Sequence, residues 1–409
     1  METHLADWIK GSSTGDEVES ILRTCVHCGF CNATCPTYQL LGDELDGPRG
    51  RIYQIKQMFE GAEPGAATQL HLDRCLTCMN CETTCPSGVR YGRLIDIGRA
   101  EVEKRVPRGV GERVKREGLR YLVTRRWIFD AAVTFGRVMR PLLPRTLRDK
   151  LPRARGAGDV PARAHSRKVL LPGACVQPAL IPAVDAATVR VLDALGIEVV
   201  RVPDAGCCGA IDYHMNAQEA ARTKARRNID AWWPHVEAGA EAIISNASGC
   251  GAMLKDYAHL LHDDAAYAEK AARVAGSVRD LAELLAPSAS VLADLSGEPA
   301  ATRIAFHPPC TLQHAQKIRG VVESLLTQLG AMLVQVPESH LCCGSAGTYS
   351  ILQPELSRQL RARKLDNLQH DKPELILSAN IGCLAHLETA TEVPVRHWIE
   401  WVDTRLDKS

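Results

Sequence analysis

The residues of this chain that could do chemistry are its sixteen cysteines, which fall into two sets of eight. The first set forms two copies of the motif C-x2-C-x2-C-x3-C-P, CVHCGFCNATCP and CLTCMNCETTCP, which start 50 residues apart. Three thiolates spaced in this way let one tight turn wrap an iron–sulfur cube, whereas the fourth thiolate leaves the turn and reaches the other cluster. The motif therefore predicts two [4Fe–4S] clusters, one held by Cys25, Cys28, Cys31 and Cys85 and the other by Cys75, Cys78, Cys81 and Cys35.

Two other uses of clustered thiols compete with this interpretation. Tetrahedral zinc also takes four thiolates, but the doubled eight-cysteine run with both prolines favours iron–sulfur clusters. A disulfide framework is typical of exported proteins, and the segment METHLADWIK lacks the basic and apolar regions of a secretory signal. We therefore expect a cytoplasmic protein whose thiols bind metal.

The second set of cysteines lies in a second internal repeat. The pairs VLLPGAC and IAFHPPC, GCCGA and LCCGS, and AIISNASGC and LILSANIGC follow one another in the same order with nearly the same spacing. Such a pattern indicates duplication of a domain of about 130 residues. The cysteines are Cys175, Cys207, Cys208 and Cys250 in the first copy and Cys310, Cys342, Cys343 and Cys383 in the second.

Each copy has the pattern strand, helix, strand, CCG turn, helix, strand, helix, which predicts a parallel sheet covered by helices. Because the thiols follow strand ends, we expect all four of each copy at the carboxyl edge of its sheet. They could hold a further iron–sulfur cluster or a structural zinc, or form a reactive thiol group. Gly209 and Gly344 would let the backbone approach a cluster closely. We interpret His307, His314 and His386 as structural histidines, the alternative being auxiliary ligands or proton carriers.

The segment between the two ferredoxin-type motifs is also informative. Pro48 marks a helix start, and Ile52, Ile55 and Phe59 at helical spacing predict an amphipathic helix that ends near Gly61. This helical insert resembles the α-helical ferredoxin domain in the iron–sulfur subunits of succinate and fumarate oxidoreductases.

These patterns predict an α+β multidomain protein. The expected parts are a two-[4Fe–4S] ferredoxin-type domain over 1–103, a basic helical linker over 104–168, and two repeated α/β CCG domains over 169–300 and 301–409. The length of 409 residues and the 45% hydrophobic content suit several globular domains. No apolar run approaches the ~18 residues of a membrane-spanning helix.

Charge is concentrated in the linker, which carries a net +14 against −6 before it and −7 after it. Within it, residues 126–142 form a predicted amphipathic helix. Such a helix either lies on an anionic membrane surface or packs its apolar face on another domain or subunit, which we favour. Nucleic-acid binding is not expected, because the run lacks a recognised module. The apolar side is Ile128, Ala131, Ala132, Phe135, Val138, Met139 and Leu142, and the polar side is Arg126, Asp130, Thr134, Arg137 and Arg140.

The duplicated module resembles the cysteine-rich CCG domain of heterodisulfide reductase B subunits and of several respiratory dehydrogenase subunits. Those reductases have a CxxC at its end, whereas Ala247 and Asn380 replace its first cysteine here. From about residue 21 to 402 the chain resembles the iron–sulfur subunits of glycolate oxidase, most specifically in the ferredoxin motifs and in AGCCGAIDYHMNAQE, NIDAWWPHVEAGAEAI and HLCCGSAGTYS. The third subunit of anaerobic glycerol-3-phosphate dehydrogenase and lactate-utilisation proteins share the cysteine skeleton.

The resemblance implies a complex in which FAD-containing partner subunits oxidise glycolate to glyoxylate. This chain would then carry electrons to a membrane quinone at the inner face of the cytoplasmic membrane. It has no G-x-G-x-x-G turn after a strand and no P-loop, so we expect no catalytic residue or flavin site in it. The alternatives are a thiol–disulfide subunit like heterodisulfide reductase, the equivalent subunit of a lactate or glycerol-3-phosphate dehydrogenase, and a membrane-docking adaptor with structural clusters.

Overall fold

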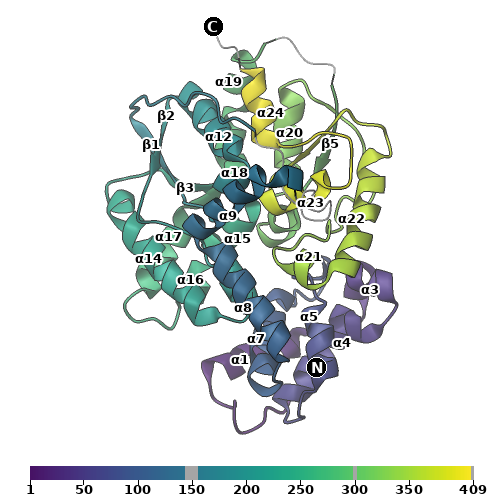
Figure 1. The fold of residues 1–409 in the computed structure, drawn as a ribbon. Helices are drawn as coiled ribbons and strands as arrows, with labels where there is room; N and C mark the ends of the chain where they lie inside the picture. Colours follow the sequence, from purple (N-terminus) through teal and green to yellow (C-terminus); the bar gives the residue numbers. More distant parts are fainter. Residues whose placement is uncertain (143–154, 298–301, 407–409) are drawn as a thin grey trace. The chain divides into compact units, whose positions relative to one another are not determined.

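The computed structural model describes residues 1–142, 155–297 and 302–406 (Figure 1). The chain forms two compact units. Unit 1 contains Met1–Glu117 and His340–Lys364, and unit 2 contains Gly118–Ser339 and Leu365–Ser409. The middle of the predicted linker, 143–154, and the predicted domain boundary at 300 lie outside the described residues.

Unit 1 is helical, and its N-terminal part has the predicted helix at its centre. Helix α4 begins with Pro48 at its first turn and ends at Phe59, with Ile52 and Ile55 buried on one face. Helix α7 packs against α1, α4 and α5 around a single hydrophobic core. The elements are α1 (Ser13–Thr24), α2 (Phe30–Ala33), α3 (Pro36–Leu41), the 3-10 turn η1 (Glu44–Asp46), α4 (Pro48–Phe59), α5 (Ala66–Asp73), α6 (Asn80–Thr84) and α7 (Tyr91–Arg105).

The second part of unit 1 comes from far along the chain. The segment 340–364 contains the CCG turn of the second copy, helix α21 (Tyr349–Leu352) and the start of α22 (Pro354–Gln369). Three hydrogen bonds join it to the N-terminal part of the unit. Tyr349 Oη donates to the Arg74 carbonyl at 3.1 Å, Lys115 Nζ of α8 (Val110–Thr124) donates to the Ile351 carbonyl at 3.1 Å, and Arg363 Nη1 donates to Gln39 Oε1 at 2.7 Å.

Unit 2 contains two four-stranded sheets in which every neighbouring pair is parallel, as the strand and helix pattern predicts (Figure 1). The strand orders are β2-β1-β3-β4 and β6-β5-β7-β8, so both copies have the same topology. The strands are β1 (Arg167–Leu171), β2 (Ile197–Arg201), β3 (Ala242–Ser245), β4 (Val278–Asp280), β5 (Arg303–His307), β6 (Met332–Leu333), β7 (Leu375–Ser378) and β8 (Val395–His397).

The fourth strand of each sheet is absent from the sequence-based pattern, which has three strands a copy. Strands β4 and β8 have three residues each, too few to show an alternating pattern. Both lead directly into a capped helix, α18 (Leu281–Leu285) and α24 (Trp398–Arg405). In each case the residue before the helix accepts from its backbone, and a glutamate three residues into the helix completes a capping box.

Helices connect the strands of both sheets. In the first copy these are α11 (Gln177–Leu180), α12 (Pro182–Ala194), α13 (Ala210–His214), α14 (Gln218–Glu237), α15 (Ser248–Lys255), α16 (Tyr257–Leu260) and α17 (Ala268–Ser277), followed after α18 by η3 (Ala286–Ser288) and α19 (Ala289–Asp294). In the second copy they are the π-helical turn η4 (Thr311–Ala315), α20 (Val321–Gln328), α22 and α23 (Ile381–Glu388).

The two copies also contact each other inside unit 2. Helix α12 of the first packs along α24 of the second, where Arg190 and Asp403 form an ion pair at 2.6 Å. Beside the sheets, the Ser248 amide donates to the Ala379 carbonyl at 3.1 Å. This hydrogen bond joins the regions after equivalent strands, because Ser248 follows β3 and Ala379 follows β7.

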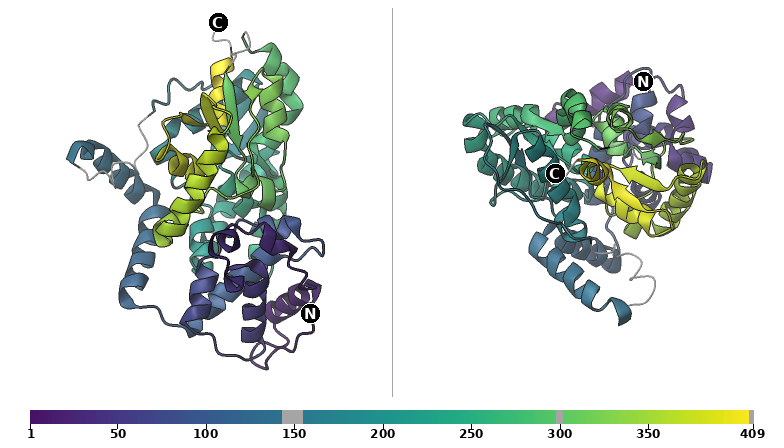
Figure 2. Two further views of the ribbon diagram at one scale, coloured as in Figure 1. Left: turned by 90° about the vertical axis from the view of Figure 1, so that its right-hand side faces the viewer. Right: turned by 90° about the horizontal axis from the view of Figure 1, so that it is seen from above.

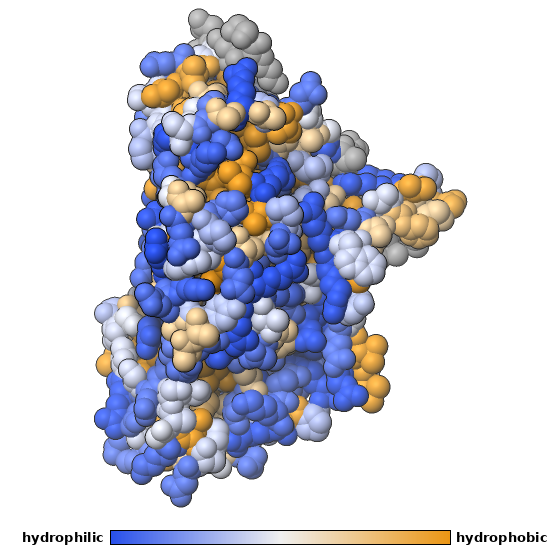
Figure 3. All heavy atoms as spheres, turned by 90° about the vertical axis from the view of Figure 1, so that its left-hand side faces the viewer, coloured by the Kyte–Doolittle hydropathy of each residue, from blue (hydrophilic) through white to orange (hydrophobic). Residues whose placement is uncertain are grey.

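The predicted basic helix is α9 (Arg126–Val138), which is followed by the 3-10 turn η2 (Arg140–Leu142). Its polar side faces the rest of unit 2. There Val133 is buried, and Arg137 Nη2 donates to the Leu180 carbonyl of α11 at 2.7 Å. In Figure 2 the helix stands out from the sheets of its unit, and Figure 3 shows hydrophobic side chains gathered on it. We favoured packing of the apolar face, but the described part of this chain leaves most of that face uncovered.

Candidate metal centres

The sixteen cysteines are all free thiols, which argues against a disulfide framework. The eight N-terminal ones line two cavities in unit 1. The first has about 430 Å³ of empty space including its open mouth, and its walls hold the predicted first group together with Cys81. The second has about 290 Å³ on the same measure, and its walls hold the predicted second group. The first group is Cys25, Cys28, Cys31 and Cys85, and the second is Cys75, Cys78, Cys81 and Cys35.

The same backbone path builds both cavities. His27 and Thr77 have φ of 56° and 52°, and Gly29 and Met79, two residues later in each copy, have φ of 84° and 59°. Left-handed conformations at three non-glycine positions are strained, and such strain persists only where the surroundings impose it. In the second copy this path lets the Thr77 amide donate to the Cys75 sulfur at 3.4 Å.

Four thiols of these cavities, Cys25, Cys31, Cys35 and Cys81, have a raised pKa. Burial, and then the neighbouring thiolates, raise the pKa of Cys31 to about 11. Burial and the thiolates of Cys78, Cys35 and Cys75 likewise raise the pKa of Cys81 well above its ordinary value. Positive charge in the cavity would favour the thiolate form of these buried sulfurs, and iron would supply it as it displaces the protons. The donor set and the empty space both fit an iron–sulfur cube.

Charged and polar side chains that the cysteine motifs do not reveal lie beside the second cavity. Arg51, Thr37 and Tyr91 line it together with the thiols. Tyr91 Oη donates to the Cys75 sulfur at 3.6 Å, and Thr37 Oγ1 lies 3.3 Å from the Cys35 sulfur. One sequence feature indicates that Arg51 is buried: it is a charged residue next to Ile52 on the buried face of a predicted amphipathic helix.

The four cysteines of the first CCG copy come together at the carboxyl edge of its sheet. Side-chain hydrogen bonds link Cys175 to Cys207, Cys207 to Cys208, and Cys208 to Cys250. Thiol donors on both sides hold the pKa of Cys207 well below its ordinary value, and Lys224 acts in the same direction. These contacts raise the pKa of Cys175 and Cys208. Soft sulfur donors in this number suit iron or zinc.

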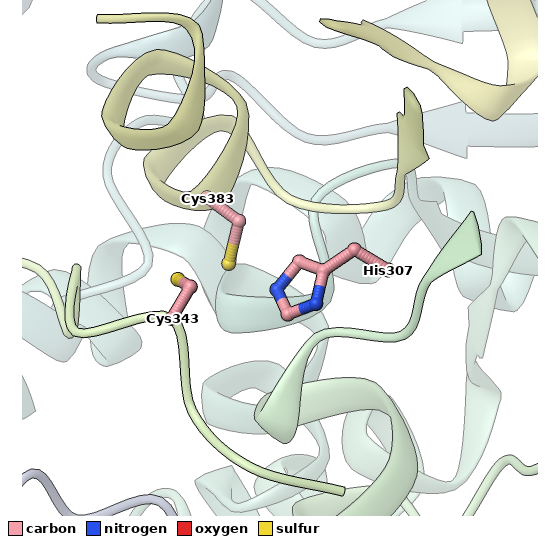
Figure 4. Close-up of side chains that lie close together, drawn as sticks. All are labelled: His307, Cys343 and Cys383. Atoms are coloured by element: carbon pink, nitrogen blue, oxygen red, sulfur yellow. The ribbon is translucent and has the colours of Figure 1, made fainter. Parts of the chain in front are cut away.

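In the second CCG copy, the ligand atoms of His307, Cys343 and Cys383 lie within 4.8 Å of one another (Figure 4). His307 ends β5, Cys343 belongs to the CCG turn, and Cys383 lies in the first turn of α23. Cys310 and Cys342 are also buried.

The structure also defines the surroundings of the other residues of the CCG copies that the sequence analysis names. Asn380, which replaces a cysteine of the reductase pattern, directs its amide to the Cys383 sulfur at 3.8 Å. Gly209 and Gly344 have φ of 91° and 86°, and a Cβ would approach the backbone of α14 at Ala221 and of α22 at Ser357, respectively. His314 is buried near Arg319, with Nδ1 and Nη2 3.4 Å apart, and His386 is half-buried.

Comparisons with known proteins agree with this architecture. A 4Fe-4S dicluster domain model matches residues 21–89, and a cysteine-rich CCG domain model matches 170–255 and 304–388. The chain is 56% identical over the full length of both chains to the glycolate oxidase iron-sulfur subunit of Escherichia coli. It is 29% identical to a probable glycolate oxidase iron-sulfur subunit of Bacillus subtilis, over 91% of this chain and 90% of the relative.

A more distant relative is lactate utilization protein A of an Exiguobacterium, with 28% identity over 52% of this chain and 85% of the relative. That match covers only part of the chain, whereas the E. coli match includes the ferredoxin-type domain, both CCG copies and the linker between them. With its two thiol-lined cavities and its duplicated CCG sheets, the chain belongs to the family of glycolate oxidase iron–sulfur subunits.

Proposed function

We propose that this chain is the electron-transfer subunit of a flavin-dependent glycolate dehydrogenase, which oxidises glycolate to glyoxylate. FAD-containing partner subunits would deliver the electrons, and a membrane quinone would accept them. Family membership supports this role, and one observation carries it: two adjacent cavities of unit 1 are lined by the eight thiols of a duplicated motif.

The motif spacing and the cavity walls together support the ligand assignment. The first [4Fe–4S] cluster would be held by Cys25, Cys28, Cys31 and Cys85, and the second by Cys75, Cys78, Cys81 and Cys35. When bound, such clusters accept and release single electrons. The protein then supplies thiolate ligands, amide and hydroxyl donors to the sulfurs, and burial that sets the local electrostatics.

Segment 340–364 supports a route from the second cavity toward the second CCG copy. Tyr349 is buried, its hydroxyl donates to the carbonyl of Arg74, and the next residue is the ligand Cys75. Burial, and then the nearby Cys75, raise the pKa of Tyr349, and Cys342 acts in the same direction. Tyr349 thus lies near a thiol of the second cavity and near Cys342 of the second CCG copy. We therefore assign Cys342 to the redox centre that would follow the second cluster on the electron-transfer route.

Each CCG copy is a further candidate site, for an iron–sulfur cluster or for zinc. The linked sulfurs of Cys175, Cys207, Cys208 and Cys250 support metal binding in the first copy. In the second, the thiols Cys310, Cys342, Cys343 and Cys383 would be joined by His307, whose ring lies beside two of them.

Anaerobic purification of the whole complex, with iron, acid-labile sulfide, zinc and EPR analysis, tests these assignments. Two cubes require about eight irons and eight sulfides a chain. About twelve or sixteen irons would place clusters in one or both CCG copies. A folded chain with zinc and no sulfide would contradict the proposed function. Glycolate, lactate and glycerol 3-phosphate, offered to the complex with a quinone analogue, then identify the substrate.

Helix α9 supports peripheral attachment to the inner face of the cytoplasmic membrane. Trp127, Phe135 and Val138 are 72, 68 and 72% exposed, and their spacing places them on one side of the helix. Leu142, in the turn η2 that follows, is 77% exposed. Arginines flank this side, and the linker is the basic part of the chain, which suits an anionic lipid surface. No described helix is both long and apolar enough to cross a bilayer.

Vesicle sedimentation tests this attachment. Wild-type protein should bind vesicles of anionic lipid, and binding should weaken as salt is added. The double variant Trp127→Ser/Phe135→Ser and the double variant Arg126→Glu/Arg140→Glu should both lose binding. Met332→Ser, at an exposed apolar residue elsewhere in unit 2, is the matched control. Equal sedimentation of all four proteins would contradict the attachment.

A thiol–disulfide activity is the second candidate function, favoured by the low pKa of Cys207. A thiolate flanked by two thiols could attack a disulfide and be resolved by a neighbour. Replacement of Cys207 by serine should then abolish heterodisulfide turnover, with Cys342→Ser as the matched change in the other copy. Unchanged turnover in both variants would remove this function.

A further inference from the structure

The wall of the second cavity contains a buried cation, the guanidinium of Arg51, whose side chain is 1% exposed. All three of its nitrogens have partners. Nη2 lies 3.3 Å from the Asp46 carboxylate, Nε donates to the His71 carbonyl at 2.8 Å, and Nη1 donates to the Thr37 hydroxyl at 3.1 Å. A buried charge is tolerated when it is paired and hydrogen-bonded in this way.

Burial by itself would lower the pKa of Arg51, but the surrounding acidic groups raise it. The largest contributions come from Tyr91 and Cys75, followed by Cys35 and Asp46. Two of these four groups are predicted ligands of the second cluster. The guanidinium is therefore a permanent positive charge next to that cavity.

Thr37 connects this charge to a ligand. Its hydroxyl accepts from Arg51, donates to the Asp46 carbonyl at 2.8 Å and lies 3.3 Å from the Cys35 sulfur. A ligating Cys35 is a thiolate that can only accept, so its sulfur would compete with the Asp46 carbonyl for the single hydroxyl proton. A hydroxyl that also accepts from a guanidinium is a better donor to the sulfur.

The ion pair has a definite orientation. Arg51 lines the cavity, whereas Asp46 lies behind it, where Arg74 at 2.8 Å and His71 at 3.1 Å are its other partners. The positive end of the pair therefore faces the thiols. Asp43, Asp46 and His71 also place ligand atoms within 4.8 Å of one another. Because two arginines already occupy the Asp46 carboxylate, we assign this group to the ion-pair network and not to a metal.

We propose that Arg51 raises the reduction potential of the cluster held by Cys75, Cys78, Cys81 and Cys35, acting through its charge and through Thr37. This inference rests on the proposed function. Reduction adds one electron, which the reduced flavin of a partner subunit supplies, and no bond of this chain forms or breaks. A fixed cation at the wall stabilises the added negative charge, and net charge and hydrogen bonds to sulfur are known determinants of cluster potentials.

The first cavity provides the matched comparison within the same molecule. Arg49 lines it, but the side chain is 36% exposed and is paired with Glu44 at 2.7 Å, which is itself 41% exposed. Solvent screens an exposed pair of this kind strongly. Arg49→Gln should therefore have much less effect on the first cluster than Arg51→Gln has on the second.

A redox titration of the anaerobically purified complex, followed by EPR, tests the proposal. Wild-type protein should show two reduction steps for the two ferredoxin-type clusters. Arg51→Gln should lower one step by at least a tenfold change in the ratio of reduced to oxidised cluster at fixed potential, which is about 59 mV for one electron. Arg51→Lys, which keeps the charge, should shift the step less, and Thr37→Val should shift the same step.

Several outcomes would overturn the proposal. Equal shifts in Arg51→Gln and Arg51→Lys would show that packing and not charge is responsible. A comparable shift of the first cluster in Arg49→Gln would show that burial of the cation does not strengthen its effect. If Arg51→Gln does not fold, Thr37→Val decides, because an unchanged step in that iron-loaded variant contradicts the relay to Cys35. Wild-type protein without sulfide would overturn the proposed function as well, whereas two normal clusters with unmoved potentials would overturn this inference alone.

Discussion

The two N-terminal cavities are copies of one motif with the same backbone path, and they differ in what surrounds the thiols. The first opens to solvent at Cys28, and its arginine, Arg49, is in an exposed ion pair. The second is backed by Arg51 and by Asp46, a carboxylate that is fully buried. The duplication therefore supplies two similar ligand sets, and the neighbouring charges make the sites electrically different.

The two CCG copies also differ in the titratable side chains at equivalent positions, the caps of α18 and α24. Asp280 caps α18 and His397 caps α24, each with a glutamate three residues into the helix. Burial raises the pKa of Asp280 to about 6, whereas burial lowers the pKa of His397 to about 3. Both shifts favour the neutral form, so the two caps respond to pH in opposite directions.

The largest expected effect separates the two ligand sets. Cys35→Ser should remove the second cluster, with a loss of about four irons a chain, although Cys35 belongs by sequence to the first motif. Cys85→Ser is the matched variant and should remove the first cluster. Iron content and EPR identify which cluster is lost. Loss of the first cluster in Cys35→Ser would show that the ligands do not cross between motifs.

A smaller effect should distinguish the two ion-pair networks. Asp46→Asn leaves Arg51 as a buried charge without its carboxylate and should lower the free energy of unfolding by about 3–5 kcal/mol. Glu44→Gln, at the exposed pair of the first cavity, should cost about 1 kcal/mol or less. Urea denaturation of the metal-free chain measures both. Similar losses would mean that burial does not distinguish the networks.

The pH dependence of unfolding should reveal the two caps. His397 is neutral when folded, so its contribution to stability is present above about pH 6.5 and is lost as the pH falls toward 3. Asp280 is protonated more readily when folded, so its contribution is present below about pH 4 and is lost as the pH rises through 6.

Substitution of each cap by asparagine tests this difference, because asparagine can still cap a helix but does not titrate. His397→Asn should flatten the acid side of the stability profile, and Asp280→Asn should flatten the loss between about pH 4 and 6. Urea denaturation across this pH range measures both profiles. Identical profiles in the two variants would contradict the opposite assignments.

The smallest effect concerns the shared backbone path. Gly29→Ala should destabilise by about 1–2 kcal/mol, because its φ of 84° is left-handed. The new Cβ would also lie 2.6 Å from Arg49 Nη1. Gly42→Ala, with φ of 66° and open space around it, carries the backbone cost alone. Equal losses of thermal stability would show that the contact with Arg49 adds nothing.

Much of the fold followed from local patterns. The helix over Pro48–Phe59, the parallel sheets and the placement of thiols after strand ends are confirmed, because each depends on residues close together in the chain. The fourth strands escaped prediction because three residues show no period. The association of segment 340–364 with unit 1 also gave no signal, since a contact 275 residues apart, such as Tyr349 with Arg74, leaves no local pattern.

In the candidate site, too, the sequence predicted the local features and the tertiary structure decided the others. Cysteine spacing alone predicted the two thiol groups, because a cluster is wrapped by neighbouring residues of one turn, and that assignment stays a prediction until iron is measured. Only the tertiary structure decided that Arg51 is buried against one group while Arg49, two residues earlier, is exposed beside the other. Burial depends on which elements pack around a side chain, and electrostatic strength depends on burial, so this difference is not encoded in spacing.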